Sequence, residues 1–308
     1  MSGAFELQGH RGARGLFAEN TLAGFAGALA VGVHTIELDV AMTADDVVVV
    51  AHDPVLHADL TRRPDGRWLE ATGPPVRSLR LDELRRYDVG RARPGSATAA
   101  AFPDQRADDG ARIPTLAEVF ALTAHSGVRI DVELKTDPND PALTVAPEVM
   151  AEAVLAAASA AKAMRRLAVR AFAWAGLRHL GARHPEVPLV WLTDAETASG
   201  AALWWQSPGP EAFAGSVGRA VAAASMGPAA APATWAPDHV GLTEAAIAEA
   251  HALGLRVGPW TVNAESDMRR LIGWGVDGFC TDRPDLARPV LARAGLGLPV
   301  PWPMLHSA

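Results

Sequence analysis

Two acidic residues in one apolar segment are the first candidates for chemistry. Glu37 and Asp39 alternate with Ile36, Leu38 and Val40. In a β-strand, residues two apart point to the same face, so the two carboxylates should project together while their apolar neighbours face the other way. An acidic pair of this kind is often part of a solvated sheet face. Here the neighbours are apolar and must pack beneath helices, which makes a solvated face the weaker interpretation.

A second segment, 131–135, repeats this pattern with the residues Asp-Val-Glu-Leu-Lys. If the two segments end at one place, the carboxylates of Glu37, Asp39 and Glu133 repel one another unless a cation neutralises them. A site with only oxygen ligands suits Mg²⁺ or Ca²⁺ better than zinc. We therefore predict one divalent cation held by these three residues.

Two of the ten histidines, His10 and His52, come directly after strand-like segments. Imidazole titrates near neutral pH, so one histidine can accept a proton while the other donates one to a leaving oxygen. A lone histidine is usually structural. The position of these two beside acidic strand ends favours a catalytic acid–base pair.

Cations and an aromatic residue accompany these candidates. Arg11 can bind phosphate oxygens through two nitrogens, and Lys135 can act as a point charge. The alternative for Lys135 is a structural ion pair with Glu133 or Asp39. Trp260 can form an apolar wall against the carbon backbone of a substrate, although an ordinary core tryptophan explains it nearly as well.

The elements that must position these residues alternate between strand-like and helix-like segments, which predicts an α/β fold with βα units around a parallel sheet. About eight strand-like segments each lead into a helix, as in a (β/α)8 TIM-type barrel. Residues at the carboxyl ends of the strands then converge on one mouth, where active sites of this fold lie. By alternation Asp131 shares a face with Glu133, so we expect it to line the lower barrel or to assist the metal.

The alternation is lost between residues 54 and 112, where only Ser78–Tyr87 looks helical. A stretch of this length fits an inserted subdomain after the second strand better than a loop. We expect one catalytic barrel over residues 1–292, with 54–112 as a capping insertion, and a tail over 293–308. The segment 201–232 is the least regular, and we assign it only as helix plus loop.

Composition excludes several classes of protein. The chain of 308 residues is 49% hydrophobic and 20% charged, with a net charge of −7, so it has a packed core but no basic face for nucleic acid. The single cysteine, Cys280, excludes an intrachain disulfide and a Cys-based zinc site. We see no signal peptide and no membrane span, so we expect a cytoplasmic protein without integral membrane contact.

Several short motifs resemble those of the glycerophosphodiester phosphodiesterases in order and spacing. The resemblance covers about residues 8–290, and its combined signal is strong although each motif alone is weak. The matching motifs are Gly9-His10-Arg11-Gly12, Glu19-Asn20-Thr21, Glu37-Leu38-Asp39-Val40, Val50-Ala51-His52-Asp53-Pro54, Val132-Glu133-Leu134-Lys135, Trp260-Thr261-Val262-Asn263, Gly275-Val276-Asp277-Gly278 and Thr281-Asp282-Arg283-Pro284.

This resemblance implies hydrolysis of glycerophosphodiesters, which are small-molecule substrates, to an alcohol and glycerol 3-phosphate. We expect the protein to be a monomer or homodimer. It implies the roles given above: metal ligands, an acid–base pair, phosphate contacts from Arg11 and Lys135, and Trp260 beside the glycerol. One departure is Ala171-Phe172-Ala173, where the family often has Ser-Phe-Asp. We expect this change to remove a hydroxyl and a carboxylate from the mouth.

Two alternatives remain. A lysophospholipase D-like enzyme acting on lysolipids predicts an exposed apolar rim, for which Trp204, Trp205 and Phe213 are the candidates. Packing of these aromatic residues against the barrel is the simpler interpretation. A non-catalytic barrel that binds a phosphodiester is the other alternative, because a fold does not fix a function.

Overall fold

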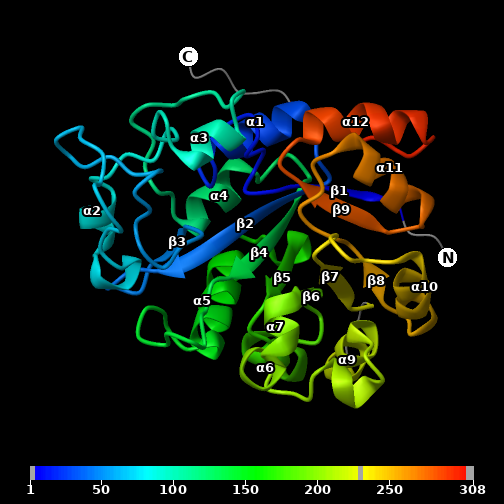
Figure 1. Ribbon diagram of the computed structural model, residues 1–308. Helices are drawn as coiled ribbons and strands as arrows, with labels where there is room; N and C mark the ends of the chain where they lie inside the picture. Colours follow the sequence, from blue (N-terminus) through cyan, green and yellow to red (C-terminus); the bar gives the residue numbers. More distant parts are fainter. Residues whose placement is uncertain (1–3, 228–231, 303–308) are drawn as a thin grey trace.

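The computed structural model describes residues 4–227 and 232–302 (Figure 1). Within them, eight parallel strands form the barrel in the spatial order β8-β7-β6-β5-β4-β2-β1-β9. The strands are β1 (Glu6–Gly9), β2 (Thr35–Met42), β4 (Arg129–Leu134), β5 (Leu167–Ala171), β6 (Leu189–Thr193), β7 (Thr234–Pro237), β8 (Arg256–Val257) and β9 (Gly278–Thr281). Backbone hydrogen bonds from Cys280 to Pro259 and from Val262 to Cys280 join the two edges. The predicted (β/α)8 barrel is confirmed.

Helices surround these strands and begin where the sequence provides caps. The side chain of Thr21 accepts a hydrogen bond from Gly24 at the start of α1, and Thr115 forms a capping box with Glu118 at the start of α4. The outer helices are α1 (Leu22–Val31), α4 (Leu116–Leu122), α5 (Pro147–Ala160), α6 (Ala175–Arg183), α7 (Ala195–Ser199), α8 (Ala201–Trp204), α9 (Val217–Ala224), α10 (Glu244–Ala252), α11 (Glu265–Gly273) and α12 (Pro284–Arg293).

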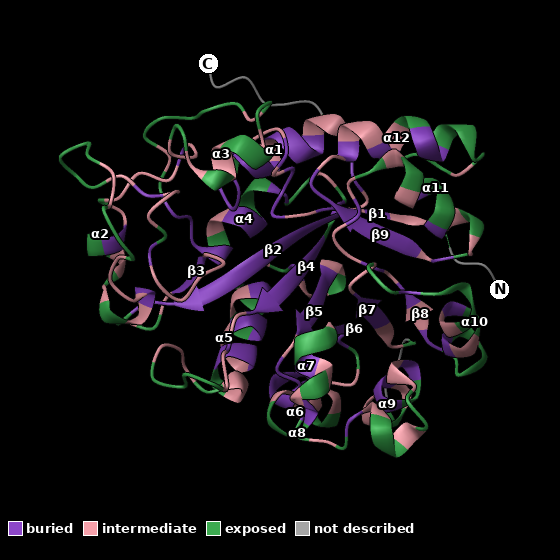
Figure 2. Cartoon of the chain, viewed as in Figure 1, coloured by how far each residue is buried: buried purple, intermediate pink, exposed green. Residues whose placement is uncertain are grey.

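The main core lies between the barrel strands and these helices. Every residue of β2 is buried, and Ile36, Leu38 and Val40 belong to this core, as their alternation with the acidic residues predicts. Figure 2 shows the strands as buried and the outer faces of the helices as exposed. The opposite face of β2 is therefore directed into the barrel, together with Glu37 and Asp39.

One further strand, β3 (Val48–Val50), pairs antiparallel with β2 and lies outside the barrel. It leads into the segment coloured cyan at the left of Figure 1, which contains the short helices α2 (Leu81–Leu84) and α3 (Ala97–Ala101) and a 3₁₀ turn at Val76–Ser78. This segment packs around a small apolar cluster, separate from the main core, that includes Leu56 and Leu84 together with Ala41 of β2 and Val49 of β3. The prediction that only Ser78–Tyr87 is helical was wrong, because Ser96 caps a second helix by accepting from Ala99.

Some expected boundaries differ from those in the structure. From the apolar run at 255–262 we expect one continuous strand, but β8 is only Arg256–Val257, because Gly258 and Pro259 follow and proline has no N–H to continue the ladder. Of the segment expected as helix plus loop, residues 228–231 lie outside the described part, and so do residues 303–308 of the expected tail.

The aromatic residues proposed for an exposed rim do not form one. Trp205 is fully buried and stacks on Trp174 with ring centroids 4.3 Å apart, while Trp204 and Phe213 pack partly buried against the main core. The simpler interpretation, packing against the barrel, is correct. No helix in the described part of the chain combines the length and the hydropathy needed to cross a bilayer.

Candidate active site

The eight residues predicted for the site come together at the carboxyl ends of the barrel strands. Seven of them line one cavity of about 280 Å³ at the mouth of the barrel: His10, Arg11, Glu37, His52, Glu133, Lys135 and Trp260. Asp39, the eighth, is only 1% exposed and lies directly beside this cavity against Arg11 and Lys135. No residue of the predicted set lies elsewhere in the molecule.

The three predicted metal ligands form one buried cluster. β2 and β4 pair in a register that puts Asp39 opposite Glu133, and Glu37 lies one pleat away on the same face of β2. One ligand oxygen from each of the three carboxylates lies within 4.8 Å of the others. Because all three are buried, solvent does little to screen their mutual repulsion.

The charges in this cluster are unequal. Burial and the neighbouring Asp39 raise the pKa of Glu37 well above its usual range. Burial alone would also raise the pKa of Asp39, but the charges of Arg11, His52 and Lys135 outweigh it and hold that pKa well below its usual range. Three carboxylates are crowded together in a buried place, and the raised pKa of Glu37 means that its ionised form needs additional positive charge nearby. A hard divalent cation bound by all three would supply that charge.

Two cations border the acidic cluster. The Nε atom of Arg11 lies 3.2 Å from Asp39, and its Nη1 donates to Glu19 at 2.7 Å. The Nζ atom of Lys135 lies 2.7 Å from Glu133 and 3.8 Å from Asp39. The structural ion pairs considered for Lys135 therefore exist, while both cations also line the cavity.

His10 is oriented by the last strand of the barrel. Its Nδ1 lies 2.6 Å from Oδ1 of Asp282, which directly follows β9, and its Nε2 lies 4.0 Å from Glu37. The hydrogen bond to His10 helps to hold the pKa of Asp282 below its usual range, against the effect of burial. An ionised carboxylate can only accept, so Nδ1 carries the proton and Nε2 faces the mouth. Burial lowers the pKa of His10 itself, and Asp282 offsets part of this effect.

His52 has a similar arrangement on the other side of the site. It follows β3, and the backbone N–H of Ala51 donates to the carbonyl of Asp39, which fixes the chain beside the acidic cluster. Its Nδ1 lies 2.7 Å from Oδ1 of the adjacent Asp53. Each imidazole therefore has a carboxylate partner on Nδ1.

The turn after β1 requires glycine. Gly12 has a φ of +93°, and a Cβ on it would lie 3.0 Å from the backbone of Gly24 in α1. The turn allows the backbone N–H of Arg11 to donate to Glu37 at 2.9 Å. Asn20, at the end of the same loop, donates to Asp39 at 2.9 Å. The loop therefore positions two of the three acidic residues.

The apolar wall of the mouth is formed by Trp260 and Phe172, whose rings meet edge to face at 5.3 Å. The indole N–H of Trp260 donates to the carbonyl of Ala236 at 2.9 Å, so the ring is fixed in position. Ala171, however, belongs to the core that faces the helices. The expectation that Ala171 removes a hydroxyl from the mouth was wrong, because β-strand alternation directs Phe172 inward and Ala171 outward.

Below the acidic cluster, a buried ion pair forms the floor of the site. Nη1 of Arg170 donates to Asp131 and to Gln8, each at 3.2 Å, and Arg170 also lines the cavity. Burial raises the pKa of Asp131 to about 6, although the charge of Arg170 acts against this shift. Of the two roles expected for Asp131, the structure supports lining the lower barrel.

Sequence reasoning gave no role to Asp282, Glu19, Asn20 or Asp53, although all four lie within the quoted motifs. Each one holds a predicted site residue by a hydrogen bond. It also missed Arg170, for which a single charged residue within the apolar run 167–171 was the available signal.

Comparison with known proteins agrees with this geometry. The profile of the "Glycerophosphoryl diester phosphodiesterase family" matches residues 10–286. A glycerophosphodiester phosphodiesterase from Caldanaerobacter subterraneus is 26% identical, with 93% of this chain and 97% of that protein covered. A lysophospholipase D from Rattus norvegicus is 32% identical over 42% of this chain and 36% of its own length.

A solved structure of a proposed glycerophosphoryl diester phosphodiesterase from Silicibacter pomeroyi is 35% identical and superimposes with a TM-score of 0.86, covering 96% of each chain. The profile match extends from the first predicted catalytic residue, His10, to the start of the last helix, α12. The chain belongs to the glycerophosphoryl diester phosphodiesterase family.

Proposed function

We propose that this protein hydrolyses glycerophosphodiesters to an alcohol and glycerol 3-phosphate in a reaction that depends on one divalent cation, Mg²⁺ or Ca²⁺. Membership of the family supports the reaction class. The buried cluster of Glu37, Asp39 and Glu133, with two imidazoles at the same mouth, is the observation that carries the proposal.

In this proposal Glu37, Asp39 and Glu133 hold the cation. Their oxygens are close enough to bind one ion together, and without it the three carboxylates repel one another. When bound there, a divalent cation supplies Lewis-acid polarisation of the phosphate and a template for orienting the substrate. The hydrogen bonds from Arg11 and Asn20 hold the carboxylates of Glu37 and Asp39 in place.

The two histidines move the protons. With Nδ1 of each imidazole bonded to a carboxylate, Nε2 is the atom that exchanges a proton with the substrate. One histidine takes the proton of the attacking group, and the other gives a proton to the departing alkoxide oxygen. The attacking group is water, or the vicinal glycerol hydroxyl through a cyclic phosphate.

Substrate binding falls to the remaining residues. Arg11 and Lys135 contact the phosphate and offset its charge, and Trp260 with Phe172 lies against the glycerol carbons. We place the inserted segment 54–112 over the site as a cap, because β3 and His52 connect it directly to the mouth.

The test is release of glycerol 3-phosphate from a panel of glycerophosphodiesters, with Mg²⁺, Ca²⁺ or a chelator added to the protein. We expect turnover that stops with chelator and returns when one of the two metals is restored. Turnover that chelator leaves unchanged would rule out metal dependence. Tight binding of substrate without turnover would favour the non-catalytic barrel.

A lysophospholipase D-like activity is the second candidate, favoured by the similarity to the rat enzyme over 42% of the chain. The burial of Trp205 removes the apolar rim that we had connected with it. Lysophosphatidylcholine in the same panel separates the two activities, and we expect it to be the poorer substrate.

A further inference from the structure

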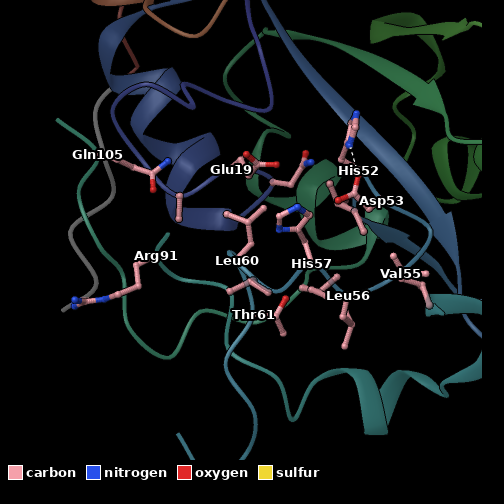
Figure 3. Close-up of a pocket in the computed structure, with 17 residues that line it drawn as sticks. Glu19, His52, Asp53, Val55, Leu56, His57, Leu60, Thr61, Arg91 and Gln105 are labelled. Carbon is pink, nitrogen blue, oxygen red and sulfur yellow. Dashed lines mark hydrogen bonds and ion pairs between the residues drawn. The ribbon is translucent and has the colours of Figure 1, made fainter. Parts of the chain in front are cut away.

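A second cavity, of about 60 Å³, lies between the loop after β1 and the inserted segment (Figure 3). Figure 3 shows Leu56 and His57 beside Asp53, Leu60 beyond His57 toward Glu19, and the ring of His52 pointing away from them. Nine apolar side chains, Leu60 among them, form most of its wall. They are Ala18, Val50, Ala51, Val55, Leu56, Leu60, Val76, Val89 and Ile113.

Eight polar side chains also line this cavity, and all of them except Thr61 have a hydrogen bond within the described part of the protein. Glu19 binds Arg11, Arg91 binds Asp109, and Gln105 donates to the backbone carbonyl of Arg14 at 2.9 Å. Oδ1 of Asn20 is a buried acceptor without a partner among the described residues. It can serve one hydroxyl group, so a ligand with several hydroxyl groups would find few partners here, and each buried hydroxyl without one is unfavourable. The cavity is therefore suited to a group of carbon atoms.

This cavity borders the mouth of the barrel, where the proposed reaction takes place, at one residue. His52 lines both this cavity and the mouth, and no other residue in the described ranges 4–227 and 232–302 lines both. Asp53, which holds Nδ1 of His52, also lines the smaller cavity. A group in this cavity is thus in contact with Asp53, the carboxylate that orients His52, one of the two proposed proton-transfer groups.

We infer that this cavity is the subsite for the alcohol portion of the substrate, and that it selects short-chain alcohols with a single hydroxyl over polyols. This inference rests on the proposed function. The phosphate occupies the mouth, the ester oxygen to the alcohol lies beside His52, and the alkyl chain extends into the cavity. His52 is then the histidine that protonates the departing oxygen, and His10 serves the attacking group.

The size of the cavity sets the length of the chain. At roughly 10–15 Å³ for each water-sized probe, the cavity has room for about four to six such spheres, which is about the length of a butyl chain. Each methylene that enters an apolar site improves binding by about fourfold. Within a series of glycerophospho-n-alkanols, kcat/KM should therefore rise about fourfold per carbon up to butanol and then fall.

The experiment compares the methanol, ethanol, butanol and hexanol esters and glycerophosphoglycerol, using wild type, Leu60→Ala and Leu60→Phe. Leu60→Ala enlarges the cavity and should raise the hexanol-to-ethanol ratio of kcat/KM by at least about tenfold, the gain from two further methylenes. Leu60→Phe fills the cavity and should lower the butanol-to-methanol ratio. If Leu60→Ala does not fold, Leu60→Phe tests the same wall in the opposite direction.

Leu79→Ala is the matched control, because Leu79, like Leu60, is a partly buried leucine of the inserted segment, and it does not line the cavity. Its ratios should stay within about twofold of wild type. Ratios in both Leu60 variants that equal those of wild type would overturn the inference, as would a preference of wild type for glycerophosphoglycerol. Absence of turnover of every ester by wild type would instead reject the proposed function.

Discussion

The Nδ1 atom of His10 lies 2.6 Å from Oδ1 of Asp282, across the seam between β1 and β9. Asp282 is in turn fixed by Asn263, whose side-chain nitrogen donates to it at 2.7 Å. This chain of contacts holds the imidazole with Nε2 toward the mouth, and its effect on His10 can be measured.

Asp282→Asn should lower kcat/KM by roughly 10- to 100-fold, because the imidazole loses the partner that fixes its orientation. The carboxylate raises the pKa of His10, so its removal leaves burial to lower that pKa further. The limb of the pH profile that reports His10 should move to lower pH, whichever proton His10 transfers. An unmoved limb would show that Asp282 does not act on His10.

His10→Ala and His52→Ala should each reduce turnover by about 10²–10⁴-fold, because each removes one proton-transfer group. The matched control is His125→Ala, since His125 is exposed and does not line the cavity at the mouth. Circular dichroism establishes that each variant is folded. Near-wild-type turnover in either of the first two variants contradicts the acid–base assignment.

Glu37→Gln should abolish stabilisation by metal while changing the metal-free protein little. Burial and Asp39 raise the pKa of Glu37 well above its usual range, so without metal a neutral side chain is already favoured there, and glutamine resembles it. Metal at a hundred times its Kd should stabilise wild type by about 2.7 kcal/mol. Thermal melts with and without Mg²⁺ or Ca²⁺ provide the measurement, and an equal shift in Glu37→Gln would remove this residue from the ligand set.

Arg170→Gln should lower the free energy of unfolding by about 3–5 kcal/mol, because it leaves Asp131 buried without its partner. The double variant Asp131→Asn/Arg170→Gln removes both charges and should lose less. Urea denaturation measures both, with the exposed Arg165→Gln expected to stay within about 0.5 kcal/mol of wild type. A double variant less stable than Arg170→Gln would contradict the ion-pair account.

The positions of the predicted site residues followed from the sequence because strand alternation is a local property. Glu37 and Asp39 share a face whatever surrounds them, and the parallel pairing of βα units brings Glu133 alongside. Charged residues at strand ends are therefore sufficient to predict the mouth of the barrel.

The partners of these residues could not be obtained in the same way. Asp282 meets His10 across 272 positions of sequence, and Arg170 meets Gln8 across 162, so both contacts depend on closure of the barrel. The helix at Ala97–Ala101 and the early end of β8 depend on a cap and on a proline, local features that weak periodicity conceals. The same alternation that located the acidic residues should also have placed Ala171 outside the mouth.

Because β3 runs antiparallel to β2 and leads out of the barrel, the two imidazoles are carried by different parts of the structure. His10 is attached to the closed frame of strands, whereas His52 stands at the root of the insert, which has an apolar cluster separate from the main core. The hydrogen bond from Ala51 to Asp39 keeps the start of the insert on β2. Loosening of the rest of the insert therefore frees Asp53 and the side chain of His52 while the barrel strands stay paired. On warming, loss of activity should therefore occur at a lower temperature than unfolding of the barrel. The difference between these two temperatures measures how strongly the insert is held against the barrel.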